Sequence, residues 1–257
     1  MILRRLGNKS KIADEIQKQF PQHNTYIEPF FGAGGMFFNK QKAKHNFVND
    51  LDSDVFNLFN VVRNQKNELS EAVFNMPIHS DLLKHWKANK ETEPVKKALR
   101  FLMLSNFTLN GTGSQLRFMT NDTKQNILEL LPATNKVLFD VVFDNSCFRE
   151  FLNKISFRGR EADTENSFIY CDPPYLNTVD NYSHSFKEQD AQDLFDCLIE
   201  TACKFAYSEF DNPFILQQAE KRGLNIIVIG ERQNLKNRRT EILVTNYKKP
   251  LSLFDDV

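Results

Sequence analysis

The hydrophobic and polar positions of this chain alternate between two periods, one typical of strands and one typical of helices. Short apolar runs, several rich in β-branched or aromatic side chains, predict strands at residues 25–30, 46–49, 137–143, 167–171, 205–208, 225–229 and 241–246. The apolar spacing between these runs predicts helices at residues 36–42, 52–63, 148–155, 187–203 and 213–222. Strands that alternate with helices form a mostly parallel sheet covered on both faces, so we expect an α/β fold.

The middle of the chain breaks this alternation. Apolar spacing predicts three successive helices at residues 69–74, 81–88 and 95–104. Residues 106–126 follow, rich in Asn, Thr, Gly and Ser and with little periodicity, which favours one long functional loop. The pattern therefore predicts a main domain formed by residues 1–65 and 136–257, interrupted by a helical insert at residues 66–135.

Composition and charge exclude some classes of protein. The chain has 257 residues, of which 41% are hydrophobic and 26% charged, as in a folded globular protein rather than a disordered one. Lys plus Arg equals Asp plus Glu at 33 each, so any positive surface for a nucleic acid must be local. No signal-peptide core or apolar run of membrane-spanning length is present, and we expect a cytoplasmic protein. The four cysteines lack zinc-ligand spacing and are interpreted as buried free thiols: Cys147, Cys171, Cys197 and Cys203.

A glycine-rich turn follows the first predicted strand. Residues 28–35 read Glu-Pro-Phe-Phe-Gly-Ala-Gly-Gly, and glycines at a strand end let the backbone approach a ligand closely. The third glycine of the dinucleotide fingerprint is missing because position 37 is Phe, which disfavours a nicotinamide-dependent oxidoreductase. An acidic residue about 20 positions further on is expected to hold ribose hydroxyls, and both Asp50 and Asp52 qualify. We favour Asp50 because it ends the second predicted strand.

A second motif, Asp172-Pro173-Pro174-Tyr175, comes directly after the apolar run at residues 167–171. The two prolines fix the backbone, so a carboxylate, the carbonyl of Pro173 and an aromatic ring are presented together. These groups suit a planar ring that bears an amino group. The Asp172 carboxylate and the Pro173 carbonyl accept its two hydrogens, and Tyr175 stacks on the ring. Positioning and electrostatics should then matter more than early proton removal.

These motifs, in this order, resemble a known family. The sequence is similar to Dam-like DNA adenine-amino methyltransferases, in which the glycine motif precedes the target-recognition segment and the Asp-Pro-Pro-Tyr motif follows it. The match also includes Gly7-Asn8-Lys9 near the N-terminus, Asn49-Asp50, Tyr182 with Phe186, Asp190 and Leu194, and residues 208–213 and 239–247. The resemblance implies a Rossmann-like fold with a seven-stranded sheet, and seven strands are predicted above.

The resemblance also implies a cofactor and the residues that bind it. Members use S-adenosyl-L-methionine as methyl donor and need no metal, because the sulfonium is already an activated donor. The cofactor-binding positions carried over are Gly7, Lys9, Glu28, Pro29, Phe30, Gly32, Gly34, Asp50, Phe148 and Asp172. Two positions depart from the family: Arg5 stands where an aromatic residue is common, and Cys147 stands where an acid usually binds the adenine amino group of the cofactor.

The implied substrate is an adenine in double-stranded DNA. A base inside a duplex cannot reach such a site, so it must be flipped out at a cost of about a few kcal/mol. Residues 100–117 resemble the stretch ahead of the family's DNA-contacting loop, and residues 232–239 form a basic cluster. The candidate DNA-binding residues are Asn110, Arg117, Arg232, Arg238 and Arg239.

Three alternatives remain open at this point. The same two acceptors and aromatic ring would also suit the amino group of cytosine or of an RNA adenine. Asp rather than Ser or Asn at position 172 favours adenine in DNA. A catalytically inactive DNA-binding relative is a further possibility, opposed by the intact motifs at Lys9, Asp50 and Asp172. A cognate restriction endonuclease is a candidate genetic partner of the protein. We expect it with the nucleoid and at no membrane.

Overall fold

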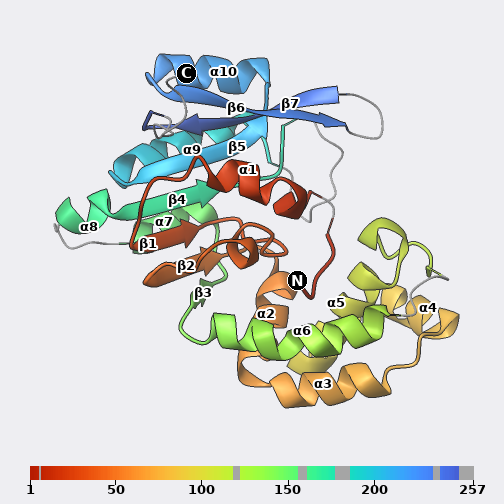
Figure 1. The fold of residues 1–257 in the computed structure, drawn as a ribbon. Coiled ribbons are helices and arrows are strands. Elements are labelled where there is room, and N and C mark those ends of the chain that lie inside the picture. Colours follow the sequence, from red (N-terminus) through yellow and green to blue (C-terminus); the bar gives the residue numbers. More distant parts are fainter. Residues whose placement is uncertain (6, 118–121, 156–160, 177–185, 234–237, 249–257) are drawn as a thin grey trace, which may run out of the picture.

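The computed structural model describes residues 1–5, 7–117, 122–155, 161–176, 186–233 and 238–248. Its centre is a seven-stranded sheet in the order β3-β2-β1-β4-β5-β7-β6 (Figure 1). The strands are β1 (Thr25–Glu28), β2 (His45–Asn49), β3 (Val142–Asp144), β4 (Ser167–Cys171), β5 (Lys204–Phe210), β6 (Asn225–Gln233) and β7 (Arg238–Thr245). Strands β1 to β5 pair in parallel, and β7 pairs antiparallel with both β5 and β6. The predicted mostly parallel α/β sheet is therefore confirmed.

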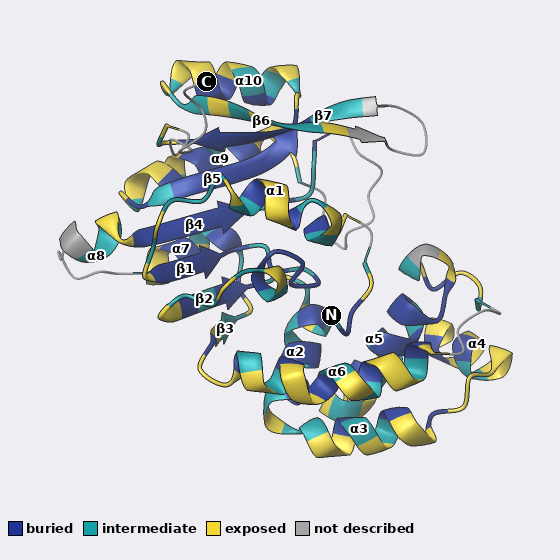
Figure 2. Ribbon diagram, viewed as in Figure 1, coloured by how far each residue is buried: buried dark blue, intermediate teal, exposed yellow. Residues whose placement is uncertain are grey.

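Helices cover both faces of this sheet because its central strands are apolar on both sides. Every residue of β1 and of β4 is buried (Figure 2), as expected for a parallel sheet. Tyr26 and Tyr170 point into the core beneath α1 (Ala13–Gln17) and α2 (Ser53–Asn64). Ile27 and Cys171, one position further along, point into the opposite core. That second core is closed by α7 (Phe148–Lys154), α9 (Glu188–Glu200) and α10 (Pro213–Lys221).

The remaining long helices form a separate group beyond the carboxyl ends of the parallel strands (Figure 1). They are α3 (Lys66–Asn75), α4 (Ser80–Ala88), α5 (Pro94–Asn106) and α6 (Thr123–Leu138). Helix α2 packs against α5 and α6, so the apolar core continues from the sheet into this group. The short elements are η1 (Lys9–Lys11), η2 (Phe37–Asn39), η3 (Leu109–Gly111) and α8 (Glu161–Glu165).

The strand predicted at residues 137–143 is wrong in its first half. Helix α6 continues to Leu138, past the predicted boundary of the insert, and β3 begins only at Val142. Ile127, Leu131 and Leu138 repeat at helical spacing and are buried in the core that α6 shares with α2 and α3. This packing outweighs the β-propensity of the local sequence.

The helix predicted at residues 36–42 is also wrong, since only the short η2 forms there. In an α-helix the Asn39 amide N–H would bond to the Gly35 carbonyl. Instead the Asn39 side chain donates to that carbonyl at 2.7 Å, while its backbone N–H bonds to Met36. The side chain therefore replaces the helical bond and ends the helix after one turn.

The predictions for the cysteines hold in part. All four are free thiols, but only Cys171 and Cys203 are buried, while Cys147 and Cys197 are partly exposed. Among the described residues, no helix combines the length and the hydropathy that a membrane crossing requires.

Candidate active site

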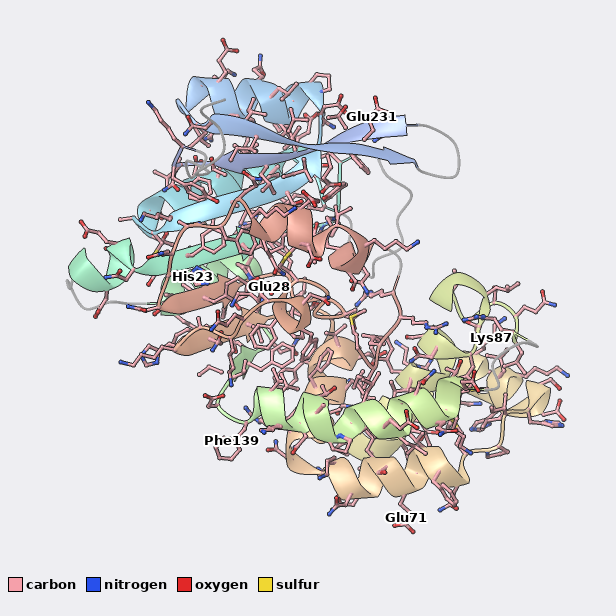
Figure 3. The ribbon with its side chains drawn as sticks, in the orientation of Figure 1. His23, Glu28, Glu71, Lys87, Phe139 and Glu231 are labelled. Carbon is pink, nitrogen blue, oxygen red and sulfur yellow. The ribbon has the colours of Figure 1, made fainter. Side chains whose placement is uncertain are left out.

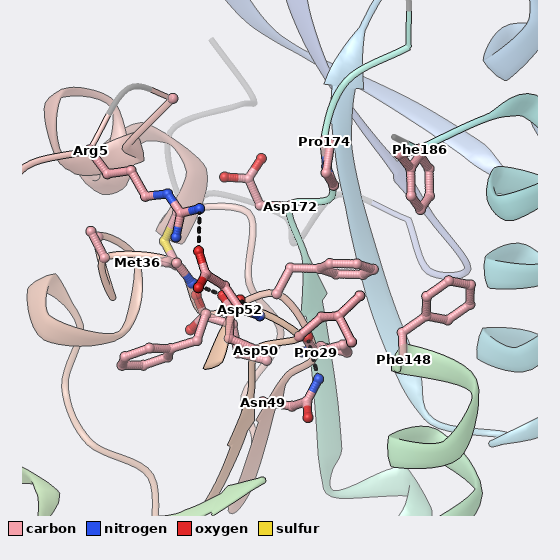
Figure 4. Close-up of a pocket in the computed structure, with 18 of the residues that line it drawn as sticks. Arg5, Pro29, Met36, Asn49, Asp50, Asp52, Phe148, Asp172, Pro174 and Phe186 are labelled. Atoms are coloured by element: carbon pink, nitrogen blue, oxygen red, sulfur yellow. Dashed lines mark hydrogen bonds and ion pairs between the residues drawn. The ribbon is translucent and has the colours of Figure 1, made fainter. Parts of the chain in front are cut away.

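A pocket of about 320 Å³ lies where β1, β2 and β4 end (Figure 4). Glu28 ends β1, Asp50 follows β2 and Asp172 follows β4, so all three carboxylates reach the same edge of the sheet. Open α/β sheets bind their ligands at this edge, and the volume lies within the usual range for small-molecule sites.

The glycine-rich turn forms one wall of the pocket. Gly32 lines it with φ at 54°, and a Cβ added there would meet no atom within 4 Å. Gly35 is required for a different reason, because a Cβ there would overlap the side-chain oxygen of Asn8. The N-terminal segment therefore packs directly on the turn, which brings Gly7 and Lys9 to the pocket.

Asp50 is held by the backbone on both sides. Its Oδ2 accepts a hydrogen bond from the Gly32 N–H at 2.6 Å, and its Oδ1 accepts one from the Asp52 N–H at 2.9 Å. Burial raises the pKa of the Asp50 carboxyl, and Arg5 and these backbone donors oppose the rise. Arg5 also forms a 2.8 Å ion pair with Asp52 at the pocket wall, so the position where the family often has an aromatic ring carries a cation.

Asn49, which the sequence reading did not single out as a site residue, fixes the loops around Asp50. Its amide donates to the Pro29 carbonyl at 2.9 Å and to the Ser146 carbonyl at 3.0 Å, and its oxygen accepts from the Ser146 N–H. A buried amide with all these bonds ties the β1, β2 and β3 strand ends together. Its place directly before an acid at a strand end is the one sequence signal that points to it.

Three phenylalanine rings form the apolar end of the pocket (Figure 4). Phe30 lies 5.7 Å from Phe148 and 6.1 Å from Phe186, measured between ring centroids. The Arg149 guanidinium lies over the Phe148 ring at 4.4 Å and is paired with Asp190 at 2.8 Å. Such a set of rings suits a flat aromatic ligand.

The acid expected beside Phe148 is replaced by Cys147, which also lines the pocket. Asp190, a residue of the resemblance without an assigned role, lines the pocket at the same end. Its Oδ2 accepts from the Lys187 N–H at 2.9 Å, so the first turn of α9 fixes its position. Arg149 was not predicted, and its place directly after the aromatic residue is the only signal for it.

Asp172 also lines the pocket and is paired with Lys9. The Lys9 ammonium donates to Asp172 Oδ1 at 2.6 Å and lies 3.7 Å from Glu241 Oε1. The side chain of Lys9 is only 4% exposed. A charge this deeply buried is stable only when paired, so Lys9 and its carboxylates act as one unit.

The hydroxyl of Tyr175 points into the protein. It donates to Glu241 and lies 3.0 Å from the Ser208 hydroxyl, and the ring meets Phe210 edge-on at a centroid distance of 4.8 Å. The Lys9 ammonium lies over the Tyr175 ring at 4.3 Å from its centroid. Burial, with Asp172 and Glu241 nearby, raises the pKa of the Tyr175 hydroxyl well above its usual value, so this hydroxyl keeps its proton.

Two further carboxyl groups are buried, that of Glu28 in the pocket lining and that of Glu209 outside it. Burial raises the pKa of Glu28 well above its usual value, although the Tyr26 hydroxyl donates to this carboxyl at 2.8 Å (Figure 3). Glu209 on β5 accepts from the backbone N–H of Leu176 at 3.1 Å and from its own neighbour Phe210 at 2.8 Å. Burial raises the pKa of Glu209 to about 8. Glu209 thereby holds the chain directly after Tyr175, a function that sequence alone did not suggest.

Most of the predicted cofactor and catalytic residues meet at the pocket. Those that line it are Gly7, Lys9, Glu28, Pro29, Phe30, Gly32, Asp50, Phe148, Asp172 and Pro174. Three predicted residues, Gly34, Pro173 and Tyr175, adjoin the lining without being part of it. Tyr182 lies outside the described residues.

The candidate DNA-binding residues come from two places. Arg117 follows the η3 turn, where its backbone N–H bonds to the Phe107 carbonyl at 2.8 Å. Arg239 on β7 lies over the Phe210 ring at 5.4 Å, and that ring contacts Tyr175. The backbones of Arg232 and Arg238 belong to the β6–β7 pair, and that of Asn110 belongs to η3. The side chains of these last three lie outside the described residues.

Comparison with known proteins supplies two relatives by sequence and one solved structure that aligns with this one. The chain is 29% identical to the DNA adenine methylase of Haemophilus influenzae over 187 residues, which span 66% of this chain and 61% of that protein. It is 24% identical over 277 residues to the type II methyltransferase M1.LlaDCHI of Lactococcus lactis subsp. cremoris, covering 94% of this chain and 93% of the relative. The N-terminal domain of human METTL16 in complex with SAH aligns with a TM-score of 0.41 and 8% identity, over 93% of this chain and 68% of that chain.

A family model matches nearly the whole chain. It is the D12 class N6 adenine-specific DNA methyltransferase model, and the match covers residues 6–240. These residues include the glycine-rich turn, the Asp-Pro-Pro-Tyr motif and the helical group between them. The chain belongs to the family of D12 class N6 adenine-specific DNA methyltransferases.

Proposed function

We propose that the protein transfers a methyl group from S-adenosyl-L-methionine to the exocyclic amino group of an adenine flipped out of double-stranded DNA. The observation that carries this proposal is the position of Asp172. Its carboxylate lies directly after β4, lines the same pocket as the three phenylalanine rings and is paired with Lys9. A cofactor lying along the pocket with its adenine at the rings would direct its methyl group toward Asp172.

The pocket's own groups fit the cofactor. The rings of Phe30, Phe148 and Phe186 would hold its adenine, and Asp50 would accept the ribose hydroxyls. The open space beside Gly32 leaves room for the amino-acid part next to the segment of Gly7 and Lys9. When bound, the cofactor supplies a methyl group activated by its sulfonium.

The remaining chemistry belongs to the motif after β4. The Asp172 carboxylate and the Pro173 carbonyl accept the two amino hydrogens of the target adenine, which leaves the nitrogen lone pair directed at the methyl group. Positive charge moves onto that nitrogen during transfer, and the Asp172 carboxylate stabilises it. Pro174 limits the motion of the loop, and Tyr175 stacks on the target base.

Binding of the duplex is assigned to the two elements that extend beyond this edge of the sheet, the helical group and the β6–β7 pair (Figure 1). The helical insert, predicted at residues 66–135, would recognise the target sequence. Phosphate contacts from Arg117, Arg232, Arg238 and Arg239, with Asn110, would hold the duplex while the base is flipped. Chromosomal DNA as substrate would place the protein with the nucleoid, and the type II name of one relative makes a cognate restriction endonuclease a candidate genetic partner.

The proposal is tested by expressing the protein in a bacterial host that lacks adenine methylation and mapping modified bases by single-molecule sequencing. We expect N6-methyladenine at one short motif with the wild-type chain and none with Asp172→Ala. The variant should still bind S-adenosylhomocysteine in calorimetry, with reduced affinity, because the rings and Asp50 remain. Methylated cytosine, methylated RNA alone, or full activity of Asp172→Ala would each contradict the proposal.

A further inference from the structure

Glu241 is a fully buried carboxylate that the proposed reaction does not yet use. It lies on β7 with 0% of its surface exposed. Its Oε1 accepts a hydrogen bond from the Ser208 hydroxyl at 2.7 Å and another from the Tyr175 hydroxyl. The last strand of the sheet therefore holds the aromatic residue of the catalytic motif in place.

The same carboxylate shares a cation with Asp172. The Lys9 ammonium lies 2.6 Å from Asp172 and 3.7 Å from Glu241, with its side chain 4% exposed and that of Glu241 1% exposed. At these short distances, and with so little water nearby, each carboxylate interacts strongly with the ammonium. Lys9 thus occupies a site between two negative groups, closer to one of them.

This arrangement bears on the acceptor role of Asp172. The Asp172 oxygen that binds Lys9 has its charge partly neutralised, which makes it a weaker acceptor for the amino group of a base. If Lys9 moved away with no second anion nearby, its buried charge would lose its partner at a cost of several kcal/mol. Glu241 supplies that second anion on the side away from the pocket, since Glu241 does not line the pocket.

We infer that Glu241 is a positioning residue of the methyl transfer, which takes over the Lys9 ammonium when the target amino group binds Asp172. The inference rests on the proposed function and deepens it. Lys9 pairs with Asp172 before the base enters, which keeps the catalytic loop ordered. On entry, the amino hydrogens replace the ammonium at Asp172, and Lys9 moves toward Glu241 while Tyr175 stays fixed by its hydroxyl. No bond is made or broken in this step.

The test is the rate of a single turnover with saturating cofactor and unmethylated duplex DNA. Glu241→Gln keeps the size of the side chain and an oxygen that can accept the two hydroxyl hydrogens, and removes only the charge. We expect its rate to fall about 10- to 100-fold, comparable to the loss of one preorganised transition-state interaction. The dissociation constant for S-adenosylhomocysteine should change by less than about threefold, because the groups proposed to hold the ligand are untouched.

Two comparisons separate this role from a merely structural one. In a Lys9→Met background, Glu241→Gln should lower the rate by less than about threefold, because Glu241 acts through Lys9. Glu241→Asp keeps the charge and should recover part of the rate. The matched control is Glu220→Gln, which removes one negative charge from the exposed end of α10, outside the pocket and the elements assigned to the duplex, and should leave the rate unchanged.

Four outcomes would overturn the inference. A wild-type rate for Glu241→Gln, or a loss of equal size with and without Lys9, would show that Glu241 does not act through the ammonium. If Glu241→Gln does not fold, Glu241→Asp takes its place. A double variant of Glu241→Asp and Lys9→Met whose loss of rate equals the product of the two single losses would show the same. A wild-type protein that methylates nothing would instead refute the proposed function, and the inference with it.

Discussion

Asp50 offers the sharpest test of the cofactor site, because its two carboxylate oxygens have different partners. Oδ2 accepts from the Gly32 N–H and Oδ1 accepts from the Asp52 N–H. In Asp50→Asn one of these oxygens becomes an amide NH₂, which cannot accept a hydrogen bond. One of the two backbone N–H groups then loses its partner whichever way the amide is turned.

The size of the effect follows from these bonds. A backbone donor left unsatisfied in a buried place costs about 1 to 3 kcal/mol, so the variant should be destabilised by that amount. Hydrogen bonds to a charged acceptor contribute about 1.5 to 3 kcal/mol, and the ribose hydroxyls would lose this acceptor. We therefore expect S-adenosylhomocysteine to bind about 10- to 150-fold more weakly.

The assay is isothermal titration of wild type and Asp50→Asn with S-adenosylhomocysteine and with its 2′,3′-dideoxy analogue. The analogue lacks the ribose hydroxyls, so the variant should lose much less affinity for it. Asp144→Asn is the matched control, because Asp144 ends the neighbouring strand β3 and pairs with Lys154 at 2.7 Å outside the pocket. Equal losses for both ligands, or an unchanged affinity for S-adenosylhomocysteine, would refute the ribose assignment.

Two further predictions concern the rings and the buried acid on β5. Phe148→Ala should cost about 1 to 3 kcal/mol of stacking and weaken S-adenosylhomocysteine binding accordingly in calorimetry, while Phe139→Ala, at a ring that is 83% exposed, should change nothing. Because the pKa of folded Glu209 is about 8 and its ordinary value is 4.5, the folded state holds this proton more tightly, and stability falls as pH rises between these values. Glu209→Gln removes that fall, so in urea unfolding the stability of the variant relative to wild type should rise by about 3.5 kcal/mol from pH 5 to pH 8. Parallel pH profiles of the two proteins would contradict this prediction.

Features of the fold that depend only on residues close together in the sequence could be predicted. The start of α2 is one example, since Asp52 accepts from the Asp54 N–H at 3.0 Å and caps the helix as its residue type predicts. Strand β4 is another, because an apolar run of five residues followed by two prolines allows few other structures. The pocket followed from the same local signals, because strand ends and glycine turns define where a parallel sheet binds its ligand.

Residues 137–143 show where local signals fail. Val137 and Phe139 favour a strand by their residue type, but Leu131 and Leu138 are buried in the core beneath α6. Packing against α2 and α3 decides between helix and strand here, and these helices lie more than fifty residues earlier in the chain. No window of sequence around residue 137 contains that information.

The interactions among the charged groups around Asp172 could not be predicted from any single sequence motif. Lys9 and Asp172 were predicted as site residues from two separate motifs, yet their side chains form one ion pair across 163 positions of sequence. Glu241 joins them from the last strand, so one buried ammonium lies near two carboxylates, of which Glu241 is buried and Asp172 is partly exposed. Removing any one of these charges changes the electrostatic energy of the other two, because water is too scarce there to screen them. The effect of substituting one of these residues must therefore be measured both with and without its partners. An assignment of roles motif by motif would attribute part of that effect to the wrong residue.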